Sequence, residues 1–125
     1  MLSRAHRLHN RRDVERVSRM GRPVHAPSIT VRAVPNRLGR TRATVVAGLK
    51  ASKRATVRNR VKRLVREALR RHLPSIRTDA DLVVYVKPVA VGKSYRELAD
   101  EVGRTLGRAG LLRGPWVDTE VKREE

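Results

Sequence analysis

The residues best suited to chemistry lie together between Lys50 and Arg71, and they are cations. Ten Lys or Arg side chains in this segment accompany a single acid, Glu67. Ten cations less one acid give a local charge of +9, half of the formal +18 of the chain. At its centre stands the run Arg58-Asn59-Arg60, whose guanidinium groups can bind phosphates bidentately and whose amide can donate and accept. The segment predicts a surface that binds a polyanion, RNA or DNA.

An apolar stripe runs through the same segment at helical spacing. It consists of Val57, Val61, Leu64, Val65, Ala68 and Leu69. Because a solvated basic tail has no need of such a stripe, we predict a helix over about 56–72 with one side buried. Ser52 or Thr56 could cap its start, and Pro74 ends it.

The other side of this helix presents the expected nucleic-acid contacts. Spacings of four residues place Arg58, Lys62 and Arg66 on one stripe, with Arg63 and Arg70 on another. Alternatively, this basic face could be exposed to solvent and only keep the protein soluble, but such a face usually carries acids as well as bases. The predicted RNA-binding residues are Lys50, Lys53, Arg54, Arg58, Asn59, Arg60, Lys62, Arg63, Arg66 and Arg70. For Asn59, a local cap or a buried hydrogen bond is an equally open role.

Catalytic residues and metal ligands are not expected. The four histidines lack metal-ligand spacing with carboxylates, and no cysteine is present. No Gly-rich phosphate loop and no nucleophile–base pair stand out. Asp79 and Asp81 could share a strand face, but flanking the start of a strand is the favoured interpretation.

The bulk properties fit one small domain. The 125 residues are 39% hydrophobic without Phe, so the core must be aliphatic. No apolar run approaches the roughly 18 residues of a membrane span, and the start lacks a secretory signal. We therefore expect a cytoplasmic protein with no membrane partner. The aromatics are few: Tyr85 suits core packing or base stacking, and Trp116 either is a packing anchor or has no specific role.

The elements that position the basic helix begin with a short helix over about 9–20, capped by Asn10. An alternating strand at 28–34, a hairpin loop at 35–39 and a second strand at 41–49 follow.

After the basic helix, the nearly continuous apolar run 81–86 predicts a central strand covered on both faces. A last helix, 94–109, opens with the capping box Ser94 and Glu97. The order α-β-β-α-β-α predicts an α+β sandwich with a small central sheet of three to four strands. Residues 1–112 form the single RNA-binding domain, and 113–125 form an acidic, polar and poorly ordered tail.

The basic segment strongly resembles the protein subunit of bacterial ribonuclease P. That family carries Ala-x-x-Arg-Asn-Arg-x-Lys-Arg ahead of a basic helix, the so-called RNR motif. The matching positions here are Ala55, Arg58, Asn59, Arg60, Lys62, Arg63, Arg66, Glu67 and Arg70. The resemblance extends over roughly residues 4–112.

The resemblance implies a ribonucleoprotein whose RNA subunit performs the catalysis. The complex would remove the 5′ leader of precursor tRNA and leave the mature 5′ end. The protein would bind the catalytic RNA through the RNR helix, as one protein per RNA, and Mg²⁺ would be bound chiefly by the RNA. The family also places the RNR helix in a left-handed β-α-β crossover.

The resemblance also implies a cleft that holds the single-stranded leader. The family usually has aromatics in its first helix where this chain has Val14 and Ser18. Since stacking of a base on an aromatic side chain is worth about 1–3 kcal/mol, that contact should be weaker or made differently here. For Val14 and Val17, packing is favoured over RNA contact. The implied cleft residues are Arg11, Arg12, Val14, Val17, Ser18 and Arg32.

Two other functions would share some of these features. A ribosomal or ribosome-assembly protein would explain the charge but not the ordered spacing around Asn59. A helix-turn-helix DNA-binding regulator would need a second helix just upstream, where 41–49 predicts a strand.

Overall fold

The computed structural model describes residues 2–116 as an α+β domain, as predicted. The α-helices and β-strands are α1 (Arg11–Met20), β1 (Val24–His25), β2 (Ile29–Pro35), β3 (Arg42–Val46), α2 (Ala55–Arg71), β4 (Ala80–Val86) and α3 (Tyr95–Arg108). Three 3₁₀ turns complete the described chain: η1 (Arg4–His6), η2 (Leu73–Ser75) and η3 (Pro88–Ala90). No helix within residues 2–116 has the length and apolarity needed to cross a bilayer.

The sheet has four strands in the order β1-β2-β4-β3. The strand β4 is central, as its apolar run predicted, and all of its residues except Tyr85 are buried. It pairs antiparallel with β2 and parallel with β3. Because α2 connects the parallel strands β3 and β4, the predicted β-α-β crossover is confirmed. Its left-handed sense stays a prediction of the resemblance.

The predicted hairpin between β2 and β3 is wrong. These strands are neighbours in sequence, but β4 lies between them and pairs with both. A strand that is apolar on both faces gains most from a central position, and only β4 has such a run. The loop after Pro35 instead passes the start of β4, where the Asn36 amide N donates to the Asp79 carbonyl at 2.8 Å.

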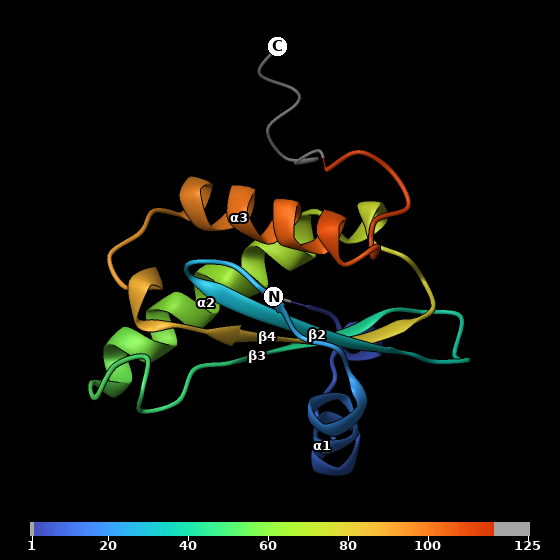
Figure 1. The fold of residues 1–125 in the computed structure, drawn as a ribbon, viewed down its shortest axis with the longest axis horizontal. Coiled ribbons are helices and arrows are strands. Elements are labelled where there is room, and N and C mark those ends of the chain that lie inside the picture. The colour runs from blue at the N-terminus through green and yellow to red at the C-terminus, as the bar shows by residue number, and fades with distance from the viewer. Residues whose placement is uncertain (1, 117–125) are drawn as a thin grey trace.

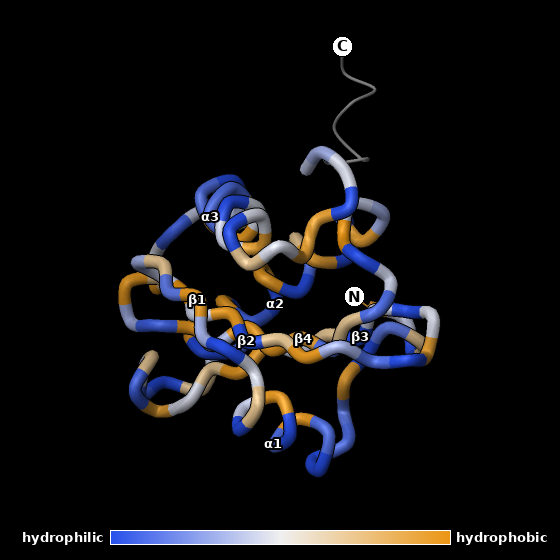
Figure 2. Tube along the Cα trace, turned by 45° about the vertical axis from the view of Figure 1, so that its right-hand side comes forward, coloured by the Kyte–Doolittle hydropathy of each residue, from blue (hydrophilic) through white to orange (hydrophobic). Residues whose placement is uncertain are grey.

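The helices cover both faces of the sheet, which separates the core into two parts (Figure 1). Helices α2 and α3 pack over one face, above the larger cluster that includes Leu82, Val84 and Leu98. Helix α1 lies on the other face, over a smaller cluster of Leu8, Val17, Val34 and Val83. Figure 2 shows the hydrophobic residues concentrated in the sheet between these layers.

Local signals explain the ends of α1 and α3. The Asn10 side chain accepts from the Arg12 amide at 2.8 Å, which confirms the predicted cap of α1. Ser94 and Glu97 form the predicted capping box of α3. At the end of α1, a Cβ on Gly21 would lie 2.9 Å from the Ala33 backbone nitrogen, so only glycine lets α1 approach β2 this closely.

The predicted cap of α2 is wrong. Its N-cap is Arg54, which makes no side-chain capping bond, because the helix begins at Ala55 and thus leaves Thr56 inside the first turn. The Ser52 hydroxyl accepts from the Arg54 amide at 3.2 Å and so orders the preceding loop rather than the helix.

The segment after α3 packs against the domain as far as Trp116. The Ser75 hydroxyl donates to the Pro115 carbonyl at 2.7 Å. The Trp116 ring stacks on His72 with 3.8 Å between centroids, and its Nε1 donates to the Ala99 carbonyl at 3.1 Å. Trp116 is therefore a packing anchor. The remainder of the predicted tail, 117–125, lies outside the described residues.

Candidate nucleic-acid interface

Helix α2 buries its apolar stripe and turns its cations outward. Val61, Val65, Ala68 and Leu69 are buried, as the helical spacing predicted. The exposed members of the predicted RNA-binding set are Lys50, Lys53, Arg54, Asn59, Arg60 and Arg63, while Arg58, Lys62, Arg66 and Arg70 are half-buried. The loop before α2 and the outer side of the helix therefore form one continuous basic surface, which we call the α2 surface.

Asn59 is exposed, and its side chain makes no hydrogen bond within residues 2–116. The alternatives of a local cap or a buried hydrogen bond are therefore wrong. Its neighbours Arg60 and Arg63 likewise lack a side-chain partner in the described chain. Guanidinium and amide groups held on a rigid helix without internal partners are available to an external one.

Arg58 has a second role within the α2 surface. Its Nη1 donates to the Ser52 carbonyl at 2.9 Å and thereby holds the basic loop against the first turn of the helix. Lys50, Lys53 and Arg54 belong to this loop or its end. Arg58 thus positions neighbouring cations in addition to contributing its own charge.

The charges of the α2 surface lie close enough to repel one another. Burial, together with repulsion from Arg66 and Arg58, lowers the pKa of Lys62. All three cations belong to α2, and their spacing of four residues places them along one side of the helix. Mutual repulsion of this kind is relieved when a polyanion binds, which favours binding of RNA.

Near its C-terminus the helix neutralises part of its charge. The Nε and Nη2 of Arg70 donate to the Glu67 carboxylate at 2.9 and 2.7 Å, and Arg71 donates at 3.1 Å. The hydrogen bond from Arg70 is the main reason that the pKa of Glu67 falls to about 2. The acid therefore pairs with the last turn and leaves the Asn59 region without a neutralising partner in the described chain.

The predicted leader-cleft residues gather around α1, but they differ in exposure. Arg11 and Arg12 are exposed at the start of the helix, and the Arg11 Nε donates to Glu15 at 3.0 Å. Val17 is fully buried, so packing accounts for it. The Arg32 Nη1 donates to the Gly21 carbonyl at 2.8 Å and ties β2 to the end of α1.

Tyr85 lies against α1. The sequence did not decide whether it serves core packing or base stacking. It packs beside Val14 at the smaller core cluster, and its hydroxyl is hydrogen-bonded to Ser18. The ring is only half-buried, so an aromatic side chain borders α1 at the place where the helix carries Val14 and Ser18. Its strand position could not reveal this, because the contact joins residues far apart in the chain.

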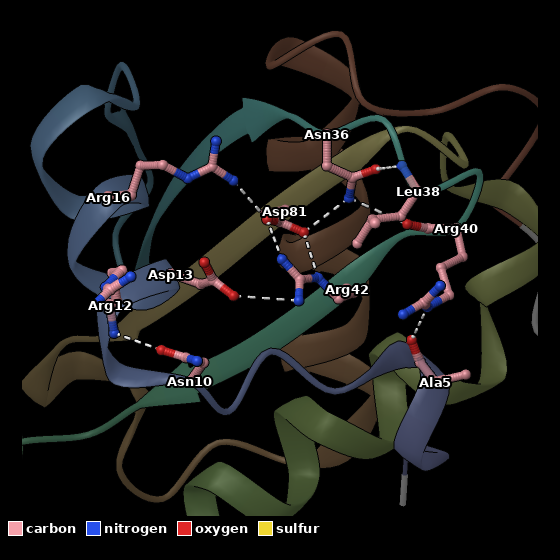
Figure 3. A network of polar contacts seen from close by, with 10 residues as sticks. All are labelled: Ala5, Asn10, Arg12, Asp13, Arg16, Asn36, Leu38, Arg40, Arg42 and Asp81. Carbon is pink, nitrogen blue, oxygen red and sulfur yellow. Dashed lines mark hydrogen bonds and ion pairs between the residues drawn. The ribbon is translucent and has the colours of Figure 1, made fainter.

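A buried carboxylate fixes α1 over the sheet (Figure 3). Asp81 on β4 is fully buried and accepts from Arg42 at 2.9 and 2.7 Å and from Arg16 of α1 at 2.9 Å. The Asn36 amide donates to the same carboxylate at 2.8 Å, and Asp13 of α1 lies 3.3 Å from Arg42. The network joins α1, β3, β4 and the loop after β2.

These contacts determine the ionisation of Asp81. Burial alone would raise its pKa, but the hydrogen bonds from Arg42 and Asn36 and the nearby charges outweigh burial and lower the pKa. Asp81 thus lies inside β4 and serves the fold, whereas Asp79 flanks the strand start as predicted. Within residues 2–116, no three His, Asp or Glu side chains lie together as a metal ligand set would require.

Comparison with known proteins places this arrangement in a family. The family model described as Ribonuclease P matches residues 2–110. The ribonuclease P protein component of Roseiflexus castenholzii is 34% identical, over 97% of this chain and 99% of its own length. That of a Cyanothece species is 32% identical, over 91% and 99%.

Solved structures share the fold. The Staphylococcus aureus RNase P protein superposes with a TM-score of 0.79 at 22% identity, covering 88% of this chain and all of that one. The RNase P protein of Thermotoga maritima gives a TM-score of 0.74 at 26% identity, covering 82% and 96%. The strand β3 directly before the basic loop also leaves no place for the helix-turn-helix alternative. The chain belongs to the ribonuclease P protein family.

Proposed function

We propose that this chain is the protein subunit of a ribonuclease P ribonucleoprotein and that it binds the catalytic RNA through the α2 surface. The observation that carries the proposal is the set of exposed side chains around Asn59, including Arg60 and Arg63, that have no partner within residues 2–116. Rigid arrays of guanidinium groups suit the phosphates and 2′-hydroxyls of folded RNA. A ribosome-associated protein would need the same charge but not the same spacing.

The reaction is the endonucleolytic removal of the 5′ leader from precursor tRNA, and the RNA subunit performs it. Mg²⁺ bound chiefly by the RNA would supply charge stabilisation for cleavage. The chain contributes binding and orientation through its basic side chains. We further propose a cytoplasmic location and a complex with one protein per catalytic RNA.

The leader of precursor tRNA would lie beside α1, along the edge of α1 where the adjoining sheet face carries Tyr85. Tyr85 presents a half-buried ring beside Ser18 and Val14. We infer that this ring replaces the stacking surface that α1 lacks. The exposed Arg11 and Arg12 at the start of the helix, together with the half-buried Arg32, would supply positive charge along the leader.

The decisive experiment is cleavage of precursor tRNA at low Mg²⁺ by a bacterial ribonuclease P RNA, with and without this protein. We expect cleavage at the mature 5′ end to depend on the protein. The variant Arg104→Ala, which removes one exposed charge on α3, should stimulate cleavage as well as the wild type does. Tight binding to ribosomal RNA without any stimulation would favour the ribosome-associated alternative instead.

The leader contact has its own test. Tyr85→Leu removes the ring, whereas Tyr85→Phe removes only the hydroxyl that contacts Ser18. We expect Tyr85→Leu to weaken binding of precursor tRNA to the holoenzyme about five- to fiftyfold, in line with the loss of one stacked base. Binding of mature tRNA, which has no leader, should not change. Equal affinities of the two variants for a long-leader substrate would contradict this role of Tyr85.

A further inference from the structure

A pocket of about 380 Å³ lies at the C-terminal end of α2, where four parts of the chain meet. Its lining includes His6 from η1, Thr41 before β3, Arg70 from α2 and Arg113 after α3. Leu73 and Ile76 give it an apolar floor. Of these residues, only Arg70 belongs to the predicted RNA-binding set.

The first observation that indicates a ligand is an unsatisfied hydroxyl. Thr41 is only 3% exposed, and its Oγ1 has no hydrogen-bond partner in the described chain. Buried polar groups without a partner are rare because they lose their hydration without compensation. Because Thr41 also lines the pocket, a ligand bound there is the candidate for the missing partner.

His6 offers a second polar group to the same pocket. Its Nδ1 lies 2.8 Å from the Thr41 carbonyl. Since a carbonyl only accepts, Nδ1 carries a proton, and in the neutral tautomer that has this proton Nε2 is an acceptor. Nε2 has no partner within residues 2–116. A donor such as a ribose hydroxyl or a base amine suits it.

The rim of the pocket is positively charged. The Arg113 Nε donates to the Pro74 carbonyl at 2.8 Å, which fixes the side chain while its terminal nitrogens make no bond to the described chain. Arg70, in the last turn of α2, also lines the pocket. An anionic group at the rim would meet both sources of charge.

We propose that this pocket binds one unpaired nucleotide of the catalytic RNA, with its phosphate at Arg113 and its polar edge at Thr41 and His6. Single-stranded RNA is recognised by placing splayed-out bases in such mixed apolar and polar sites. Pockets for small ligands commonly have about 300–1,000 Å³, so the volume is adequate. The proposal rests on the proposed function, which it extends to the far end of α2.

The position of the pocket favours the catalytic RNA over the leader. Arg66 lies one turn before Arg70, about 6 Å along the axis, and lines a smaller pocket with Arg7 and His9. Basic groups therefore continue from the centre of the α2 surface to the nucleotide pocket. Helix α1, beside which the leader would lie, covers the opposite face of the sheet from α2 (Figure 1).

The first test measures binding of the catalytic RNA by the full chain across a series of salt concentrations. Thr41→Val removes the hydroxyl while keeping the shape, so we expect three- to tenfold weaker binding at about the same salt slope. Arg113→Ala should reduce the slope by about 0.7–0.9, the value for one phosphate contact. Arg104→Ala on α3 is the matched control and should leave both quantities near the wild-type values.

Thermal stability separates this role from a structural one. Because the Thr41 hydroxyl has no partner within residues 2–116 of the free protein, Thr41→Val should keep or raise the melting temperature. A clear fall in the melting temperature would show a structural partner for the hydroxyl and would overturn the site. Affinities of both pocket variants equal to that of Arg104→Ala would overturn it as well.

Cross-linking identifies the RNA. The chain has no cysteine, so Thr78→Cys at the pocket rim can carry a single photoreactive azidophenacyl group. We expect cross-links to an unpaired nucleotide of the catalytic RNA, and Arg104→Cys should not give them. Cross-links to the precursor tRNA leader alone would overturn the assignment. If Arg60→Ala with Arg63→Ala still weakens RNA binding while the pocket variants do not, only the pocket fails.

Discussion

The α2 surface and the contact between α1 and the sheet are both rich in arginine, but their arginines differ in pairing. Beside α1, Arg16 and Arg42 donate to the buried Asp81, and Arg42 also contacts Asp13. On α2, Arg60 and Arg63 are exposed and have no partner in the part of the chain that the structure describes. The same side chain therefore stabilises the fold in one region and is available for RNA in the other. Pairing, rather than charge, distinguishes these roles.

The difference also shows how the protein tolerates a formal net charge of +18. Beside α1, the buried carboxylate of Asp81 fixes the positions of Arg16 and Arg42 and so holds α1 to the sheet. Around Asn59, the cations have no acidic partner in the described chain, and in the proposed complex RNA would neutralise them. Self-repulsion on the α2 surface is thus retained until binding, whereas repulsion beside α1 is removed on folding.

The largest expected effect is on stability, from Asp81→Asn. The substitution leaves Arg42 and Arg16 without their buried counter-charge, and breaking such a pair costs about 3–5 kcal/mol in the free energy of unfolding. Urea denaturation of the wild type and the variant measures this loss. Asp79→Asn, which breaks the surface pair with Arg77, is the matched control and should cost less than about 1 kcal/mol.

For Arg60→Ala combined with Arg63→Ala, we expect RNA binding to weaken while stability stays nearly unchanged. Both side chains are exposed and without a partner in residues 2–116, so the free energy of unfolding should change by less than about 0.5 kcal/mol. Affinity for the catalytic RNA should fall about tenfold or more, and the salt slope should decrease by about 0.7–0.9 for each phosphate that the variant no longer binds. Filter binding at several salt concentrations measures both. The control carries Arg96→Ala and Arg104→Ala on α3; equal losses from the two pairs would contradict a dedicated α2 surface.

The sequence predicts these two regions unequally well, for a physical reason. The α2 surface depends on the spacing of residues within one helix, so the buried stripe and the outward cations could be predicted from Val61, Val65 and Arg63 alone. The cap of α1 and the capping box of α3 are likewise local. These features need no knowledge of distant parts of the chain.

The Asp81 network depends on the order of strands in the sheet, and sequence patterns within a single segment do not reveal that order. The turn residues after Pro35 favoured a hairpin, yet β4 enters between β2 and β3 and brings Asp81 beside Asn36 and Arg42. The two-residue strand β1 is too short to show an alternating pattern. The place of Tyr85 against Ser18 is another contact between distant segments, so its role could not be decided from the sequence.

Acid should weaken the contact beside α1. The pKa of Asp81 is lowered in the folded protein, so its contribution is complete above the unfolded pKa of about 3.9 and is lost as pH falls through the folded value. We expect the free energy of unfolding of the wild type to drop below about pH 5 more steeply than that of Asp81→Asn. Denaturation curves at several pH values test this, and parallel pH profiles would contradict it.

The smallest expected effect concerns an arginine of α1 that is paired but exposed. The Arg11 Nε lies 3.0 Å from Glu15, with side-chain exposures of 91% and 60%. Solvent screens such i, i+4 pairs, so Glu15→Gln should cost only about 0.3–0.5 kcal/mol in the free energy of unfolding. Leader binding should be retained, because Arg11 keeps its charge and loses a competing acid. A cost near that of Asp81→Asn would show that pairing alone, without burial, stabilises α1, and burial would then no longer separate the two kinds of arginine.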